Sequence, residues 1–527
     1  MCRFLVLFAL LLSSSFHAQP PAYDVVIQGG RIIDGTGAPW FLGDIAIRGG
    51  AIVQIGSVSG AATLRLDATG LCVAPGFIDI HTHARRGIFA VPTADNYIRQ
   101  GVTTLIEGQD GSSPLPLRPF LEKLSRTPMT VNFGLLTGQG SIRQAVIGLE
   151  NRKATQAEID KMKGLVRQAM LDGAFGLSTG LFYVPGNYTP TEEVIQLARV
   201  AGEMGGIHIS HMREEAAGVL ESVRETIRIG EEGRLPTQVT HHKIIGVSNW
   251  GKSKDTLRLV EEARARGVDV SIDQYPYTAS SSSLTALFPQ WAQAGGNSAL
   301  LRRLADPQQR AKIKAEIVGR IRDDRGAGDP KNVVMANCAS GAALAGKNLA
   351  ELTQQRGRAV TLENAAETAI ELQQKGGCQV IYHAISEEDV ERILRSPFTM
   401  VASDGEIPIF GEAAPHPRSY GTFARVLGRY VRERNIISLE EAVRKMTSMP
   451  AARLGLWDRG LLRPGIKADL VVFDAATVTD KATFLNPHQY AEGVRHVLVN
   501  GKPIILDGKL TAERPGRVLY GPAYRPN

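Results

Sequence analysis

Two histidines separated by one residue, His81 and His83, end a short apolar run that begins at Phe77. If this run is a strand, its side chains alternate between two faces, so both imidazoles project from the same face at the strand's carboxyl end. Two imidazoles placed in this way are suited to binding a divalent metal. A lone His-x-His is more often one buried and one surface histidine, so other residues must decide between the two interpretations.

Further histidines and carboxylates stand at the ends of other apolar runs: Glu107, Asp110, His211, His241 and Asp404. In a barrel of parallel strands the carboxyl ends of all the strands meet at one face, where active sites form. A metal bound there would polarise a carbonyl group and lower the pKa of a bound water. A carboxylate beside it can accept a proton and pass it on. Taken singly, Asp404 is equally typical of a Ser-Asp-Gly turn, but the set together predicts a metal-dependent hydrolase.

Apolar runs alternate with helical stretches through the middle of the chain, and these elements would position the polar residues. We expect strands at residues 77–83, 102–107, 131–136, 174–178, 206–210, 238–242, 268–273 and 398–404. A helix over residues 156–172 is indicated by Thr155 as its N-cap, with Glu158 completing a capping box. Eight such strands with helices between several of them favour an α/β fold, a (β/α)8 barrel of the TIM type; a doubly wound sheet is the alternative.

The barrel is expected to occupy residues 73–456, with an insertion or lid at about 284–395 and a closing helix at 440–456. The two ends of the chain, residues 19–72 and 457–527, consist of short apolar strands with Gly-Gly and Asn-Gly turns. Because chain termini often lie close together, we expect both ends to form one small β-sandwich.

The composition excludes some classes of protein. The chain has 527 residues, with 60 Lys and Arg against 53 Asp and Glu, and these charges form no basic run of the nucleic-acid-binding type. Apart from the leader, Cys72, Cys338 and Cys378 are the cysteines, and three thiols without close spacing predict no disulfide framework. A small-molecule substrate and no nucleic acid are therefore expected, and the oligomeric state stays open.

Residues 1–18 have the pattern of a secretory signal peptide. Arg3 precedes an apolar stretch from Phe4 to Leu12, and Ala18 is a plausible cleavage point. The apolar stretch is too short to span a bilayer, and no later stretch reaches about 18 apolar residues. The prediction is a secreted or periplasmic protein with no integral membrane segment after cleavage.

Several motifs together resemble the amidohydrolase superfamily, and specifically its D-aminoacylase (N-acyl-D-amino-acid deacylase) family. The motifs are residues 75–83 (PGFIDIHTH), 176–181 (GLSTGL), 210–213 (SHMR), 241–243 (HHK), 273–277 (DQYPY), 403–405 (SDG), 416–418 (HPR) and 514–519 (RPGRVL). The resemblance covers nearly the whole chain after the leader. It implies one or two zinc ions at the carboxyl ends of the barrel strands.

The resemblance also implies roles for individual residues. His211 and His241 would bind the tighter zinc, and His81, His83 and Asp404 would line a second, weaker site. Asp404 would be the general acid and base. The side chains implied to contact the substrate are Lys243, Arg418, Tyr183 and Tyr275, with Arg418 binding its carboxylate.

The chain departs from the family pattern at the ligand that follows the second strand. Where the family usually has a cysteine inside Gly-Asn-Cys-Gly, this chain has Asp110 inside Gly-Gln-Asp-Gly. A carboxylate can bind zinc, is a harder ligand than a thiolate, and could bridge two ions. Glu107 is the rival ligand. A second departure is Gln139, where the family often has histidine, and the fourth strand offers no lysine for carbamylation.

The sequence thus predicts zinc-dependent hydrolysis of the amide bond of N-acyl-D-amino acids, with the preference for the D-configuration resting on the resemblance alone. The alternatives are a hydrolase of another amide, such as a dipeptide with a D-residue or a cyclic amide, and a catalytically silent binding protein on the same barrel.

Overall fold

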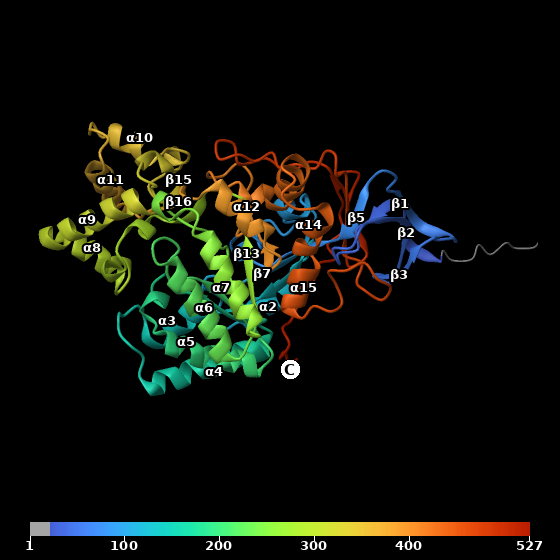
Figure 1. Cartoon of the computed structure of the whole chain (residues 1–527), viewed down its shortest axis with the longest axis horizontal. Coiled ribbons are helices and arrows are strands. Elements are labelled where there is room, and N and C mark those ends of the chain that lie inside the picture. The colour runs from blue at the N-terminus through green and yellow to red at the C-terminus, as the bar shows by residue number, and fades with distance from the viewer. Residues whose placement is uncertain (1–21, 527) are drawn as a thin grey trace, which may run out of the picture.

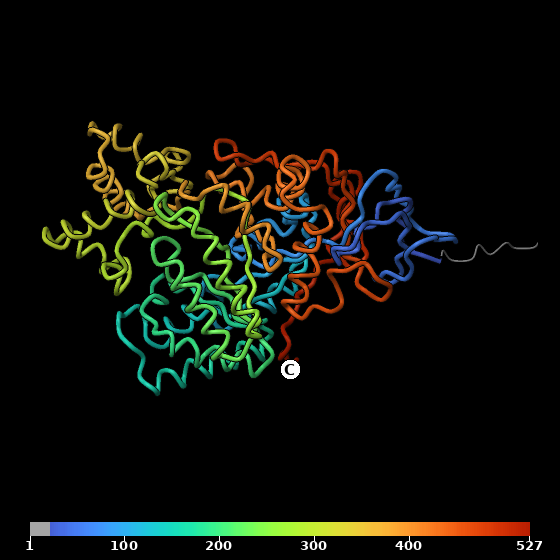
Figure 2. Tube along the Cα trace, in the orientation of Figure 1, coloured from blue at the N-terminus to red at the C-terminus, as the bar shows by residue number. Residues whose placement is uncertain are grey.

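The computed structural model describes residues 22–526, so the predicted signal peptide at 1–18 lies outside the described residues. Figures 1 and 2 show three parts: a blue and red β-region at one end, the barrel in the middle, and a yellow insertion at the far end. None of the helices within 22–526 is long and apolar enough to cross a membrane.

The barrel strands are all parallel and follow the predicted order. They are β6 (Phe77–Asp79), β7 (Val102–Glu107), β8 (Asn132–Leu135), β9 (Thr137–Gly138), β10 (Gly176–Gly180), β11 (Ile207–His211), β12 (Thr237–Val239), β13 (Val270–Gln274) and β17 (Thr399–Val401). β6, β7 and β8 form one sheet, and β9 to β13 with β17 form another. Since β8 and β9 are consecutive and separated only by Leu136, they act as one interrupted strand, which makes eight.

Backbone hydrogen bonds close the ring between its first and last strands. The Asp404 amide donates to the His81 carbonyl over 2.9 Å, and the His83 amide donates to the Gly405 carbonyl over 2.6 Å. Thr82 and Gly405 form a parallel bridge at the same point. The predicted eight-stranded barrel is confirmed, and its closure brings Asp404 beside the two histidines that follow β6.

Amphipathic helices cover the outside of the barrel. They are α2 (Arg118–Ser125), α3 (Gln139–Ile147), α4 (Gln156–Asp172), α5 (Thr191–Glu203), α6 (Val219–Gly233), α7 (Ser253–Ala265), α12 (Glu387–Arg395), α13 (Arg418–Arg425), α14 (Leu439–Met446) and α15 (Ser448–Leu454). The predicted capping box is present, because the Thr155 hydroxyl accepts from the Glu158 amide and the Glu158 carboxylate accepts from the Thr155 amide.

The prediction of a single closing helix at 440–456 is wrong, since the helix is interrupted at Thr447, between α14 and α15. Pro450 explains the break. A proline lacks an N–H and is tolerated only in the first turn of a helix, and a new helix that begins at Ser448 places it there.

Both chain ends contribute to one sheet of nine strands. Its members are β1 (Tyr23–Ile32), β2 (Phe41–Arg48), β3 (Ala51–Gly56), β4 (Ala62–Asp67), β5 (Cys72–Pro75), β18 (Leu470–Phe473), β19 (Val494–Val499), β20 (Lys502–Leu506) and β21 (Lys509–Leu510). β5 pairs antiparallel with β18 and so joins the two ends (Figure 1). Their shared core holds Ile27 and Ile47 from one end with Leu470 and Leu498 from the other.

The insertion has its own small sheet and its own apolar core. It contains α8 (Asn297–Ala305), α9 (Pro307–Asp323), β15 (Val333–Cys338), α10 (Leu349–Gln354), α11 (Leu362–Gln374) and β16 (Cys378–Tyr382). β16 pairs with β15 and also with β14 (Ser280–Ser283), which is the next strand along the chain after the barrel strand β13. The predicted end of the insertion at residue 395 lies too far along the chain, because α12 contacts α7 and β17 and therefore belongs to the barrel.

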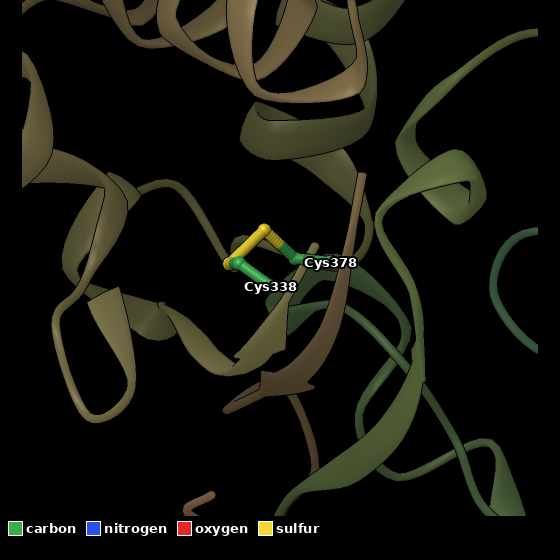
Figure 3. The surroundings of a disulfide bond; sticks show 2 residues. All are labelled: Cys338 and Cys378. Carbon is green, nitrogen blue, oxygen red and sulfur yellow. A yellow bond between two sulfur atoms is a disulfide. The ribbon is translucent and has the colours of Figure 1, made fainter. Parts of the chain in front are cut away.

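A disulfide joins Cys338 and Cys378 across β15 and β16 (Figure 3). The expectation that the three thiols form no disulfide framework did not foresee this single bond. The two residues are 40 positions apart, and only the antiparallel register of the two strands brings them together. Cys72 is a buried free thiol.

Candidate metal centre

The strand ends bring six of the predicted side chains into two groups of potential metal ligands. His81, His83, Asp110 and Asp404 form the first group, and Asp110, His211 and His241 form the second. Within each group one ligand atom per residue lies within 4.8 Å of all the others. Because the strands are parallel, side chains far apart in the sequence meet at this single face of the barrel.

In the first group, carboxylate oxygens alternate with imidazole nitrogens. The Nε2 atom of His83 lies 3.0 Å from Asp404 Oδ1 and 3.4 Å from Asp110 Oδ2. The Nε2 atom of His81 lies 3.3 Å from Asp404 Oδ1 and 3.7 Å from Asp110 Oδ1. The group has two nitrogen and two carboxylate donors facing a common centre.

In the second group, Asp110 Oδ1 lies 3.5 Å from His211 Nδ1 and 3.5 Å from His241 Nε2. These two ring nitrogens lie 2.6 Å apart. Asp110 has a φ of 55°, in the left-handed region, where aspartate is among the few tolerated side chains. Its Oδ1 atom is the one near His81, His211 and His241, and its Oδ2 atom is the one near His83, so the carboxylate contacts both groups.

The donor set fits zinc. Ligand atoms about 2.0–2.1 Å from a tetrahedral zinc lie about 3.3 Å from one another, which is close to most of the spacings found here. The atoms His81 Nε2, Asp110 Oδ1 and Asp404 Oδ1 are buried and have no hydrogen-bond partner among the described residues. Buried polar atoms without partners are costly, and a bound cation would satisfy the His81 nitrogen and the Asp110 oxygen.

Residues behind both groups support the ligands, and the sequence analysis assigned them no role. The Asp79 carboxylate accepts from the backbone amides of His81 (3.2 Å) and Ser403 (3.0 Å), tying β6 to β17. The Thr240 hydroxyl lies 2.6 Å from His81 Nδ1. Asp273 Oδ1 accepts from the His241 amide over 2.7 Å. The Asp79 and Asp273 carboxylates hold the backbone at the ligands, and Thr240 is a partner of the kind that fixes the ring orientation and the tautomer of a metal-binding histidine.

Glu215 supports the second group. Its Oε1 atom lies 3.3 Å from His241 Nδ1 and accepts from the Lys243 ammonium over 2.5 Å. Lys243 also contacts His241 Nδ1 at 2.7 Å. Sequence reasoning missed Glu215, although its position four residues after His211 was an available signal. Lys243 is buried in this network, so its predicted contact with the substrate stays a prediction.

Glu107, the rival ligand, lies outside both groups. Its Oε2 atom accepts from the Arg85 backbone amide over 2.8 Å, and its Oε1 atom lies 3.7 Å from Arg85 Nε. Gln139 is also buried, and its amide donates to the Thr189 hydroxyl. The structure therefore brings Asp110, and neither Glu107 nor Gln139, to the metal ligands.

The electrostatics around Asp404 keep its carboxylate ionised. Burial alone would raise its pKa, but the guanidinium of Arg418 and the imidazole of His81 outweigh burial and hold the pKa well below its usual range. Arg418 Nη1 donates to Asp404 Oδ2 over 2.6 Å. The carboxylate is thus ionised, with Oδ2 held by Arg418 and Oδ1 directed to the histidines.

A cavity of about 300 Å³ opens onto this centre. His83, Asp110, Asp404, Tyr183 and Arg418 line it, together with serines of β14 and Gln379 of β16. Tyr275 lies behind the wall, where the Arg418 guanidinium stacks over its ring at 4.8 Å. Of the predicted substrate contacts, Tyr183 and Arg418 reach the cavity, and Tyr275 stays a prediction.

The sequence and the fold are similar to those of known proteins. A family model described as "Amidohydrolase family" matches residues 66–505. The D-aminoacylase of Alcaligenes xylosoxydans xylosoxydans is 38% identical, over 96% of this chain and 99% of the relative. The N-acyl-D-aspartate deacylase of the same organism is 36% identical, over 96% of this chain and 97% of the relative.

A solved structure agrees with these relatives. The N-acyl-D-glutamate deacylase of Bordetella bronchiseptica, complexed with zinc and a phosphonate inhibitor that mimics the tetrahedral intermediate, superposes with a TM-score of 0.82. It is 35% identical, over 94% of this chain and 99% of that chain. The chain belongs to the amidohydrolase family, in the branch of the D-aminoacylases and N-acyl-D-amino-acid deacylases.

Proposed function

We propose that this protein hydrolyses the amide bond of N-acyl-D-amino acids, releasing a carboxylate and a D-amino acid, and that it uses one or two zinc ions. The observation that carries the proposal is the pair of ligand groups sharing Asp110 at the floor of a cavity whose wall holds Arg418. The names of the relatives, which act on N-acyl-D-amino acids, support the substrate class.

His81, His83, Asp110, His211 and His241 would hold the metal, with Asp404 beside them. When bound, zinc would lower the pKa of a water molecule and polarise the amide carbonyl. The protein's own residues then handle the protons and the orientation of the substrate.

Asp404 is the general base and then the general acid. It is ionised and its Oδ1 atom has no hydrogen-bond partner among the described residues, so it can accept the proton of the attacking water. The protonated carboxyl group then gives this proton to the nitrogen of the leaving amine. Arg418 keeps the carboxylate in place through Oδ2.

Two residues of the wall bind the substrate. The Arg418 guanidinium has further N–H donors besides the one used by Asp404, and a guanidinium matches the α-carboxylate of an amino acid in a bidentate pair. The Tyr183 ring lies 4.5 Å from the His211 ring, and burial raises the pKa of its hydroxyl. Tyr183 therefore stays protonated and can donate to the oxyanion that develops on the carbonyl oxygen.

Export from the cytoplasm is part of the proposal. The pattern of residues 1–18 supports it, and so does the Cys338–Cys378 disulfide, because disulfides persist mainly in oxidising compartments. Expression with residues 1–18 present and deleted, followed by cell fractionation, tests the localisation.

The test of function is an amine-release assay with matched N-acetyl-D- and N-acetyl-L-amino acids, dipeptides with a D-residue, and cyclic amides. We expect release from the N-acetyl-D-amino acids, its loss after metal removal, and its return with zinc. The Asp404→Asn variant is the matched control for contaminating hydrolases. Release from dipeptides or cyclic amides alone would reassign the substrate, and zinc binding without any turnover would indicate a silent binding protein.

A further inference from the structure

One part of the cavity wall has no role in the proposed reaction. Arg85 and Arg86 stand two and three residues after His83, in the short 3-10 turn η1 (Ala84–Arg86). They line the cavity together with Ser112, Ser141 and Gln144, which follow β7 or lie in the first turns of α3. This part of the wall therefore combines two guanidinium groups with hydroxyl and amide donors.

Arg85 is held at the wall with most of its donors free. Its side chain is 23% exposed, Nη2 donates to the Ser112 hydroxyl over 3.2 Å, and Nε lies 3.7 Å from the buried Glu107 carboxylate. That carboxylate accepts the backbone amide of Arg85, so it anchors the start of the side chain. A guanidinium has five N–H donors, and within residues 22–526 this one makes a single hydrogen bond.

Arg86 adds a second positive charge at the mouth. Its side chain is 54% exposed, and its Nη1 atom lies 3.7 Å from Glu406, which is itself 40% exposed. An exposed pair at this distance contributes little, so Glu406 does not tie Arg86 down. The two arginines present donors to the cavity that an anionic group would satisfy.

Arg418 and Arg85 lie beside different strands of the ring, β17 and β7, and the ligand-bearing strand β6 stands between these two. Arg418 contacts Asp404 after β17 and stacks over Tyr275 after β13. Arg85 contacts Ser112 after β7. An N-acyl-amino acid with its amide at the metal centre extends in two directions, with the α-carboxylate on the amine side and the acyl chain on the other. If Arg418 takes the α-carboxylate, the acyl chain extends toward Arg85.

We propose that the preferred substrates carry a second carboxylate at the far end of the acyl group, as in an N-succinyl-D-amino acid, and that Arg85 binds this carboxylate. The inference rests on the proposed function, since it names the acyl class for the same site. Arg85 acts here as a specificity-determining residue and takes no part in proton transfer.

The test compares two acyl groups of similar length on one amino acid, N-succinyl-D-leucine and N-butyryl-D-leucine, with zinc-loaded enzyme. We expect kcat/KM to favour the succinyl compound by about tenfold or more, the size of one charge-assisted hydrogen bond. Arg85→Gln should remove most of this preference through KM and leave hydrolysis of the butyryl compound within about twofold of wild type. The matched control is Arg167→Gln, at an exposed arginine of α4.

Equal kcat/KM for both compounds in the wild type, or a preference that survives in Arg85→Gln, would overturn the inference. A third arm compares N-acetyl-D-glutamate with N-acetyl-D-glutamine, and a preference confined to this pair would place the second carboxylate on the amino-acid side chain instead. If no N-acyl-D-amino acid is hydrolysed, the proposed function fails. Calorimetric binding of N-succinyl-D-leucine to the zinc-loaded protein, expected to be weaker in Arg85→Gln, then still decides the inference.

Discussion

The carboxylate of Asp110 is the one group shared by both sets of ligand atoms, so its replacement tests the whole metal centre. Asp110→Asn keeps the shape of the side chain and removes its charge. Asp110→Cys puts a single sulfur where the carboxylate has two oxygens. We expect the first variant to weaken both sites and the second to retain one tight ion with a weakened second site.

The size of the effect follows from the geometry. Oδ1 lies 3.5 Å from the ligand nitrogens of His211 and His241, and Oδ2 lies 3.4 Å from that of His83, so each group loses one anionic donor in Asp110→Asn. Removing one partner of a buried charged pair costs about 3–5 kcal/mol. This corresponds to a loss of about 10²–10⁴ in zinc affinity at each site.

The assay is zinc per chain, measured by elemental mass spectrometry after equilibrium dialysis against chelator-buffered zinc. Glu107→Gln is the control, because its carboxylate is buried nearby and holds Arg85 instead of a ligand group. Wild-type protein should bind up to two ions with Asp110 between them. If Asp110→Asn keeps wild-type affinity while Glu107→Gln loses an ion, Glu107 is the ligand and the assignment from the distances is refuted.

Four further changes have expected outcomes. Asp404→Asn should lower kcat by about 10²–10⁴ while the tighter zinc remains bound, and an unchanged kcat at full zinc content would contradict its role in proton transfer. Arg418→Met should raise KM by about tenfold or more, measured on N-acetyl-D-amino acids, since the bidentate partner of the substrate carboxylate is lost. Burial lowers the pKa of His208 to about 3 from 6.5, so its contribution to stability is complete above pH 6.5 and is lost as the pH falls toward 3. The free energy of unfolding, measured with denaturant between pH 7 and 4.5, should therefore decrease more steeply with falling pH in wild type than in His208→Gln. The difference in slope should be about 1.4 kcal/mol per pH unit below pH 6.5, and parallel plots of this free energy against pH would contradict the prediction. Cys338→Ser should lower the free energy of unfolding of the insertion by about 4 kcal/mol, because the bond to Cys378 closes a loop over a separation of 40 residues. The rate of proteolysis within the insertion measures this loss.

The barrel was predictable because its strands are buried on both faces and appear as separate apolar runs. All eight expected runs contain a parallel strand, and the capping box at Thr155 marks the start of α4 where it was expected. The break at Thr447 and the disulfide of Cys338 were not predicted. The first depends on where Pro450 falls in a helical turn, and the second depends on the register of two strands, which no local pattern fixes.

The site shows the same division between local pattern and tertiary contact. The period of two that placed His81 and His83 on one face places Asp79 there as well, because it stands two residues before His81. Sequence reasoning used the pattern for the two histidines and assigned no role to Asp79. What Asp79 does became visible only when β17 closed against β6 and brought the Ser403 amide to the same carboxylate. Burial raises the pKa of Asp79 to about 7 against these hydrogen bonds, so the carboxylate is costly to keep ionised. Its position is therefore better explained by holding β6 and β17 in register at the ligands than by stabilising the fold alone.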